Sequence, residues 1–220
     1  MLHQTVRPEK ILLWLSKEQF PNEDSIPQSL RSRQSDQFEI RMVEGDIRSH
    51  KKYYYISKES PDALVFLIDD DIYYDTHLIE HVMEAHQKAP NAVICNFGRH
   101  IGHNEDGSLK PYNQWCYEFH YCEADDLFFG SGGGTLFRPS WFHADLTDID
   151  NAIRLCPIAD DIWLNAMARL SGRKIIILKN GKILPVYSCN NVELFRINMD
   201  ESKNDEQISA INKYYGKQIF

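Results

Sequence analysis

Three consecutive carboxylates, Asp69, Asp70 and Asp71, come directly after a short apolar run, LVFLI, at residues 64–68. This run is shorter than a typical helix and rich in branched and aromatic residues, so it predicts a central strand buried on both faces. Ligands of open α/β sheets bind beyond the carboxyl ends of the strands. Repulsion among the acids would be relieved by a divalent cation such as Mg²⁺ or Mn²⁺. A solvated acidic turn is the alternative, and the preceding strand favours the site.

A second pair of carboxylates, Asp160 and Asp161, opens a predicted helix over residues 160–170, which Gly172 ends. The helix dipole stabilises acids at this position, so capping explains one of them but does not require two. Apolar residues along the helix would bury it and hold both acids in place. A carboxylate here could act as a general base, a role that contributes ~10²–10⁴-fold to a rate.

Glycines crowd residues 128–137, FFGSGGGTLF, and they are Gly130, Gly132, Gly133 and Gly134. Glycine is useful where the backbone bends sharply or approaches a ligand closely. The segment lacks the lysine of a P-loop, and residues 135–137 predict a strand where a dinucleotide fingerprint needs a helix. Two interpretations remain, a structural hairpin and a backbone surface against a sugar or phosphate.

Charged residues gather where a predicted strand at residues 38–43 ends, among them Asp46, Lys51 and Lys52. The two lysines fall in the first turn of the following helix, where cations are unfavourable unless an anion lies nearby. This placement mildly favours phosphate binding, and a solvated basic helix start is an equally weighted alternative.

The remaining pattern predicts an α/β fold. Further strands are expected at residues 10–15, 92–97 and 173–178, and helices at 28–34, at 76–89 with Thr76 as the N-cap, and at 205–215, with a turn at Gly181. Strands separated by helices imply a mostly parallel sheet with right-handed crossovers. Residues 98–121 form either an excursion of the sheet or a substrate-facing loop.

Composition narrows the class of protein. A chain of 220 residues with 43% hydrophobic residues is expected to form one folded domain. A net charge of −8 argues against a nucleic-acid binder, because affinity for phosphate backbones depends on Lys and Arg. No apolar segment is long enough to span a bilayer, and the N-terminus has no secretory signal pattern, so a cytoplasmic protein is expected.

The cysteines and histidines do not follow a metal-binding spacing. The cysteines are Cys95, Cys116, Cys122, Cys156 and Cys189, an odd number without a CxxC pair, which predicts reduced thiols rather than disulfides or a zinc site. His77 and His81 stand four residues apart but lack the glutamate of HExxH, so zinc is not expected there.

Four segments in the same order resemble the bacterial polysaccharide glycosyltransferases of the GT-A superfamily, which are related to family-2-like enzymes of capsule and lipopolysaccharide synthesis. They are TVRPEKILLWLSKEQFP, LIDDDIYY, GSGGGTLF and ADDIWL. The resemblance implies a GT-A-like, Rossmann-like single domain, with a nucleotide-sugar half at residues 1–97 and an acceptor half at 98–220. It also implies one more strand and helix ahead of Met1, so that this chain is N-terminally shortened.

The resemblance assigns roles to individual residues. The donor would be bound by Asp46, Lys52, Asp69, Asp70 and Asp71, and Asp69 and Asp71 would hold Mn²⁺ or Mg²⁺. Asp161 takes the place of the catalytic base, and Asp160 that of a ligand for the acceptor hydroxyl. The acceptor side would also include Gly132, Gly133, Gly134 and Trp163.

The activity implied is a metal-dependent, inverting transfer of a sugar from a nucleotide-diphosphate sugar, such as a UDP-sugar, to a glycan or lipid-linked oligosaccharide. Such an acceptor would bring the protein to the inner face of the membrane. No histidine follows His143, so the late histidine metal ligand of some GT-A enzymes is absent. The alternative is an inactive remnant that binds a nucleotide, a glycan or a partner.

Overall fold

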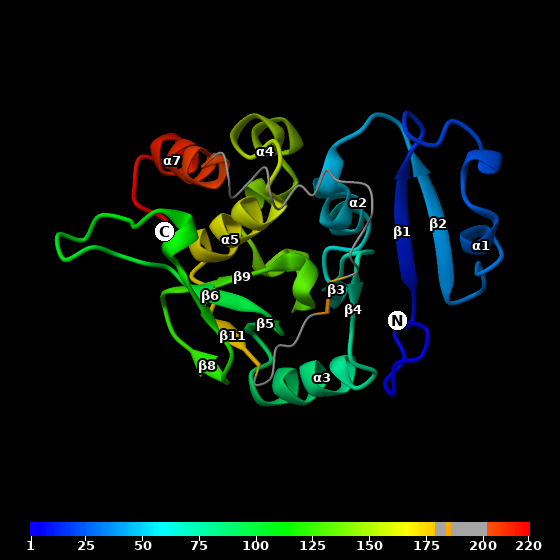
Figure 1. Ribbon diagram of the computed structural model, residues 1–220, viewed down its shortest axis with the longest axis horizontal. Helices are drawn as coiled ribbons and strands as arrows, with labels where there is room; N and C mark the ends of the chain where they lie inside the picture. The colour runs from blue at the N-terminus through cyan, green and yellow to red at the C-terminus, as the bar shows by residue number, and fades with distance from the viewer. Residues whose placement is uncertain (179–183, 186–201) are drawn as a thin grey trace.

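A computed structural model describes residues 1–178, 184–185 and 202–220 (Figure 1). The strands are β1 (Ile11–Ser16), β2 (Phe38–Val43), β3 (Val65–Leu67), β4 (Ile72–Tyr73), β5 (Val93–Cys95), β6 (Gly98–His100), β7 (Cys116–Glu118), β8 (Cys122–Glu123), β9 (Leu127–Phe129), β10 (Thr135–Phe137), β11 (Ile175–Ile177) and β12 (Leu184–Pro185). The α-helices are α1 (Gln28–Arg31), α2 (Lys51–Glu59), α3 (Leu78–Lys88), α4 (Ile149–Leu155), α5 (Asp160–Leu170) and α7 (Lys203–Tyr215). The 3₁₀ helices are η1 (Glu23–Ser25), η2 (Arg48–His50), η3 (Tyr112–Gln114), η4 (Ser131–Gly133), η5 (Pro139–Trp141) and η6 (Ala144–Thr147). The predicted turn at Gly181 and the thiol of Cys189 lie outside the described residues.

The central sheet is mixed, which corrects the expectation of a mostly parallel sheet. Its order is β3-β10-β5-β11-β8, with β5 and β11 parallel and the other neighbours antiparallel. The strand before the acids, β3, therefore lies at the edge of this sheet and not in its centre as predicted. The glycine segment accounts for the antiparallel direction of β10 relative to β3. Gly132 packs against Asp69, just beyond the carboxyl end of β3, so the strand that leaves the segment runs back along β3.

Side chains of the central strands point alternately to the two faces of the sheet, and a helix packs against each face. Val93 and Cys95 belong to the larger apolar cluster, which includes the buried residues of α5. Ile94, between them, belongs to the smaller cluster with Leu78 and Val82 of α3. Because successive side chains of a strand point to opposite faces, one helix covers each face. Figure 1 shows α3 and α5 on opposite sides of β5 and β11.

Three smaller sheets accompany this core, and one of them is the antiparallel pair of β4 and β12. Residues 98–121 contain β6 and β7, and β6 pairs antiparallel with both β7 and β9 in a separate three-stranded sheet. β1 and β2 form a separate parallel pair. Trp14 of β1 stacks on Tyr55 of α2 with ring centroids 5.0 Å apart, and Figure 1 shows α2 between this pair and the rest of the molecule.

The helix boundaries confirm most of the local pattern. α5 spans the predicted residues, and Gly172 after it has a φ of +62°. The N-cap expected at Thr76 is wrong: α3 begins at Leu78, and the Asp75 carboxylate instead accepts the amide of His77 at 2.7 Å. Short elements without periodicity, such as β4, β8 and β9, were not predicted. None of the helices in the described part of the chain has the length and apolar character needed to cross a bilayer.

The described cysteines confirm the prediction of free thiols. Cys95 and Cys156 are buried, Cys116 is exposed, and Cys122 is partly buried; none of these four forms a disulfide.

Asn165 should be essential for the junction of α5 and β9. Its amide is fully buried, donates to the carbonyls of Phe129 and Asp161 at 2.8 Å each, and accepts the Phe129 amide at 3.0 Å. Asn165→Ala leaves these buried groups unpaired and should lower the free energy of unfolding by about 3 kcal/mol. Urea denaturation measures the change. Asn113→Ala, at an exposed position, should cost less than about 0.5 kcal/mol, and equal losses would contradict the role of Asn165.

Candidate functional site

The ammonium group of Lys52 lies among side chains from three distant segments. Lys52 is in the first turn of α2, and its Nζ is 2.5 Å from Asp69 Oδ1, beyond the end of β3. The same nitrogen is 3.3 Å from Asp160 Oδ2 at the start of α5 and 3.5 Å from the Ser131 hydroxyl. The structure therefore brings together the two acidic segments and the glycine segment that the sequence singled out. We call these four residues the Lys52 cluster.

Ser131 fixes both acids at the start of α5. Its hydroxyl donates to Asp160 Oδ2 and its backbone amide donates to Asp161 Oδ1, each at 2.8 Å. Ser131 is fully buried, so neither bond competes with bulk water. Sequence reasoning missed this residue, although it is the one polar side chain inside the glycine run.

The glycines allow the backbone of this segment to pack closely against neighbouring side chains. A Cβ added at Gly132 would lie 1.7 Å from Asp69 Oδ2, and one at Gly133 would lie 2.6 Å from the Cβ of Phe97. Gly134 has a φ of +100°, which other residues rarely adopt. The hairpin interpretation is wrong, because β9 pairs with β6 whereas β10 lies between β3 and β5. All three glycines are buried, so the backbone of this segment faces protein atoms, including the carboxylate of Asp69.

Tyr74 links the acidic segment to the glycine segment through hydrogen bonds of its hydroxyl. Its hydroxyl accepts the Asp69 amide at 2.7 Å and donates to the carbonyl of Gly132. Burial raises the pKa of Tyr74, so the phenol stays protonated and remains a donor. This tyrosine was another contributor that the sequence did not reveal.

Electrostatics separate the two acids of α5. Burial, together with the adjacent charge of Asp160, raises the pKa of Asp161 to about 6. Burial alone would also raise the pKa of Asp160, but the Lys52 ammonium and the hydrogen bond from Ser131 hold it below its usual value. The carboxylates outweigh the effect of burial on Lys52 and raise its pKa, so it remains a cation. Neighbouring acids with separated pKa values are typical of acid–base sites.

Asp46 lies in a different hydrogen-bonded group from Lys52. Its carboxylate contacts the Lys51 ammonium and accepts the Arg48 amide and the Gln19 amide group, each at 2.9 Å. Burial alone would raise the pKa of Asp46, but Lys51 and the Arg48 amide lower it. Both lysines at the start of α2 thus have carboxylates as neighbouring anions. That accounts for their position without a phosphate.

The outer acids, Asp70 and Asp71, are exposed. Partial desolvation and the charges of Asp69 and Asp70 raise the pKa of Asp71, so Lys52 does not fully neutralise the run. A divalent cation would remove this repulsion, and in that respect the residues fit one. Within the described residues no third His, Cys, Asp or Glu ligand joins these acids, so a cation here would complete its shell with waters and phosphate oxygens, as Mg²⁺ commonly does.

Trp163 is a core residue, which corrects its expected place on the acceptor side. Its side chain is fully buried, and its indole N–H donates to the Leu146 carbonyl at 3.1 Å. Trp163 packs with Leu146 of η6 in the larger apolar cluster, and this packing helps to hold Asp160 and Asp161 at the start of α5. It has no exposed surface with which to contact an acceptor.

The raised pKa of Asp161 predicts a specific pH dependence. The folded protein holds a proton on this group that the unfolded chain releases at lower pH. The free energy of unfolding should therefore fall as pH rises from about 4 to about 6, by up to ~2 kcal/mol from this group. Asp161→Asn keeps an acceptor for the Ser131 amide and cannot ionise, so it should remove this part of the slope in urea denaturation.

Asp150→Asn is the matched control, because Asp150 also lies in the first turn of a helix but is exposed. It should leave the slope of the wild type unchanged. An Asp161→Asn variant that keeps the full slope between these pH values would contradict the raised pKa.

The contact between Gly132 and Asp69 predicts a coupled pair of substitutions. Gly132→Ala should lower the free energy of unfolding by about 1–3 kcal/mol, because its Cβ collides with the carboxylate. Asp69→Ala removes the colliding atoms, so the double variant should be more stable than the sum of the two losses implies. A thermal-unfolding double-mutant cycle measures this. Gly107, with open space around it, is the control: Gly107→Ala and Asp69→Ala should be additive, and additivity for Gly132 as well would refute the contact.

The comparisons with known proteins do not suggest a function, so a proposal depends on the geometry of the site. The sequence matches no family model and no curated protein.

Proposed function

We propose that this protein is a metal-dependent, inverting glycosyltransferase that uses a nucleotide-diphosphate sugar as donor. The observation that supports this proposal is the Lys52 cluster, in which Asp69 of the acidic strand end meets Asp160, while the Ser131 amide holds Asp161 beside them. A transferase of this class needs two carboxylate functions, one near the leaving diphosphate and one near the attacking hydroxyl. The cluster, together with the adjacent Asp161, offers both on rigid elements.

Asp161 is proposed as the general base. Its pKa of about 6 leaves it ionised at neutral pH yet more basic than an ordinary aspartate, which suits proton removal from a hydroxyl. In the proposed step, Asp161 takes the proton of the acceptor hydroxyl while that oxygen attacks the anomeric carbon. The bond to the diphosphate breaks, and the configuration at that carbon inverts. Asp160, kept ionised by Lys52 and Ser131, would orient the hydroxyl.

Asp69, Asp70 and Asp71 are proposed to face the donor diphosphate. Mn²⁺ or Mg²⁺ held by Asp69 and Asp71 would act as a Lewis acid for the leaving group. Lys52 holds Asp69 in a fixed position and adds a second positive charge near the diphosphate. Asp46, in its own group with Lys51, is proposed to contact the nucleoside.

The acceptor is proposed to be a glycan or a lipid-linked oligosaccharide of surface polysaccharide synthesis. With such an acceptor the protein would work in the cytoplasm, at the inner face of the membrane. The buried glycines would then act on the acceptor indirectly, by placing Asp69, Asp160 and Asp161.

Donor binding is tested by thermal unfolding with Mn²⁺ and UDP together and with each alone. A ligand at about 100 times its Kd adds ~2.7 kcal/mol, which should raise the midpoint by several degrees. The shift should need both ligands and should disappear in Asp71→Asn. Asp36→Asn, at an exposed acid outside the cluster, should keep it.

Turnover is tested with Asp161→Asn and a panel of UDP-hexoses and oligosaccharide acceptors. This variant should retain the donor shift and lose sugar transfer, because only the base is removed. An active Asp161→Asn enzyme would overturn the assignment of the base. A protein that melts cooperatively but shows no shift with any nucleotide would overturn the transferase and support the non-catalytic alternative.

A further inference from the structure

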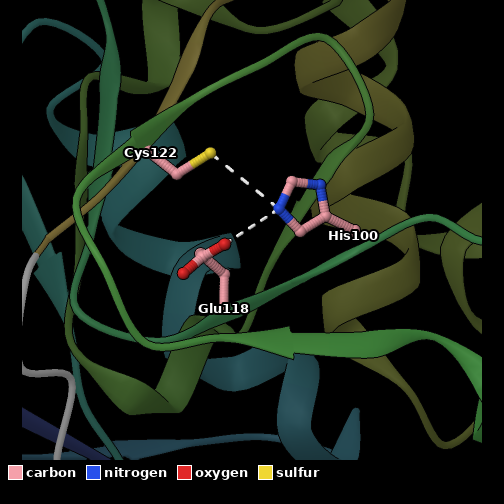
Figure 2. A group of neighbouring side chains, drawn as sticks. All are labelled: His100, Glu118 and Cys122. Atoms are coloured by element: carbon pink, nitrogen blue, oxygen red, sulfur yellow. Dashed lines mark hydrogen bonds and ion pairs between the residues drawn. The ribbon is translucent and has the colours of Figure 1, made fainter.

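A second cluster of polar side chains lies where three strands approach one another. His100 at the end of β6, Glu118 at the end of β7 and Cys122 at the start of β8 point toward a common position (Figure 2). His100 Nε2 is 3.0 Å from Glu118 Oε2 and 3.9 Å from Cys122 Sγ, and all three ligand atoms lie within 4.8 Å of one another. None of these residues belongs to the Lys52 cluster.

The strand pairing explains how these residues come together. β6 and β7 are antiparallel, with Gly98 opposite Glu118 and His100 opposite Cys116, so His100 and Glu118 are diagonal neighbours. Diagonal side chains on one face of a sheet lie within reach of each other. Cys122 comes from β8, at the edge of the central sheet, so the cluster joins two sheets.

The donor atoms select the kind of metal. An imidazole nitrogen, a carboxylate oxygen and a thiolate sulfur suit Zn²⁺, whereas Mg²⁺ and Ca²⁺ prefer oxygen alone. Bonds of about 2.0–2.3 Å to a tetrahedral zinc place neighbouring ligand atoms roughly 3–4 Å apart. Both separations from His100 Nε2 fall in that range. Only small side-chain movements are then needed to admit the ion.

Asp126 adds a feature that an ordinary ion pair does not need. Its Oδ2 is 2.9 Å from His100 Nδ1, the ring nitrogen that faces away from Glu118 and Cys122. A carboxylate that accepts the outer N–H of a histidine orients the ring and leaves the other nitrogen free to bind a metal. This is the usual arrangement around a zinc-bound histidine.

We propose that His100, Glu118 and Cys122 bind one zinc ion, with Asp126 as the positioning residue for His100 and a water in the fourth place. The ion would clamp β8 of the central sheet to β6 and β7 of the smaller sheet. The spacing of the cysteines concealed this site, because a single cysteine takes part and its partners come from separate strands. The proposal is independent of sugar transfer.

Metal binding is tested on the whole protein after treatment with a chelator. Titration with Co²⁺, a spectroscopic substitute for zinc, should saturate at one equivalent and give an intense near-ultraviolet thiolate-to-cobalt band. Zn²⁺ should abolish the band and raise the midpoint of thermal unfolding, as expected for a ligand that binds the folded state. A protein that binds no cobalt, or binds it without a thiolate band, would overturn the proposal and leave an ion-paired histidine.

Paired substitutions identify the ligands. Cys122→Ser should remove the thiolate band, whereas Cys116→Ser, at an exposed thiol of β7, should keep it. Glu118→Gln should weaken cobalt binding, whereas Glu123→Gln, at an exposed carboxylate paired with Lys174, should not. Loss of the band in Cys116→Ser with its retention in Cys122→Ser would overturn the assignment of the sulfur ligand.

Asp126→Asn tests the positioning role. It should weaken cobalt affinity by about 10- to 100-fold while the thiolate band persists at saturation, since the ligands themselves remain. Unchanged affinity would refute the role of Asp126. Circular dichroism of every variant without metal verifies that each one is folded before the affinities are compared.

Discussion

The ion pairs of Lys52 are the interaction on which the candidate site depends. Asp69, Asp160 and Asp161 approach one another in a partly desolvated place, where carboxylates without a counter-charge would repel each other. The Lys52 side chain is 24% exposed, so its pairs with Asp69 and Asp160 are less screened than surface salt bridges. Removing one partner leaves the remaining charge without its counter-charge in this partly desolvated place. One ammonium therefore joins α2, the end of β3 and the start of α5.

Close backbone packing is the second constraint, and it follows from the first. For Asp69 to reach Lys52 beside the acids of α5, the chain after β9 must pass against its carboxylate, and only a residue without a Cβ leaves room at position 132. Ser131, next in the chain, is then placed to bond both acids through its hydroxyl and its amide. The same passage turns the chain so that β10 enters the sheet antiparallel to β3. Site geometry and sheet topology thus share one cause.

The two sites proposed for this protein differ in the chemistry of their ligands. The acidic run offers only oxygen atoms, is exposed at Asp70 and Asp71, and would share a hard cation with a phosphate group. The second cluster offers nitrogen, oxygen and sulfur from His100, Glu118 and Cys122 in partly buried positions, which suits an ion that links protein segments. One site therefore suits the binding of a substrate, and the other suits stabilisation of the join between two sheets.

Local features of this fold were readable from the sequence. The span of α5, the strand β2 and the position of Asp69 at a strand end follow from periodicity and from the nearest residues along the chain. Other features came only from tertiary structure, among them the direction of β10, the partners of Lys52, the buried state of Trp163 and the meeting of His100 with Cys122. The physical reason is the separation along the chain between the residues that interact. Helix periodicity and caps act within a few residues, whereas strand direction, ion pairing and a raised pKa depend on groups that only folding brings together.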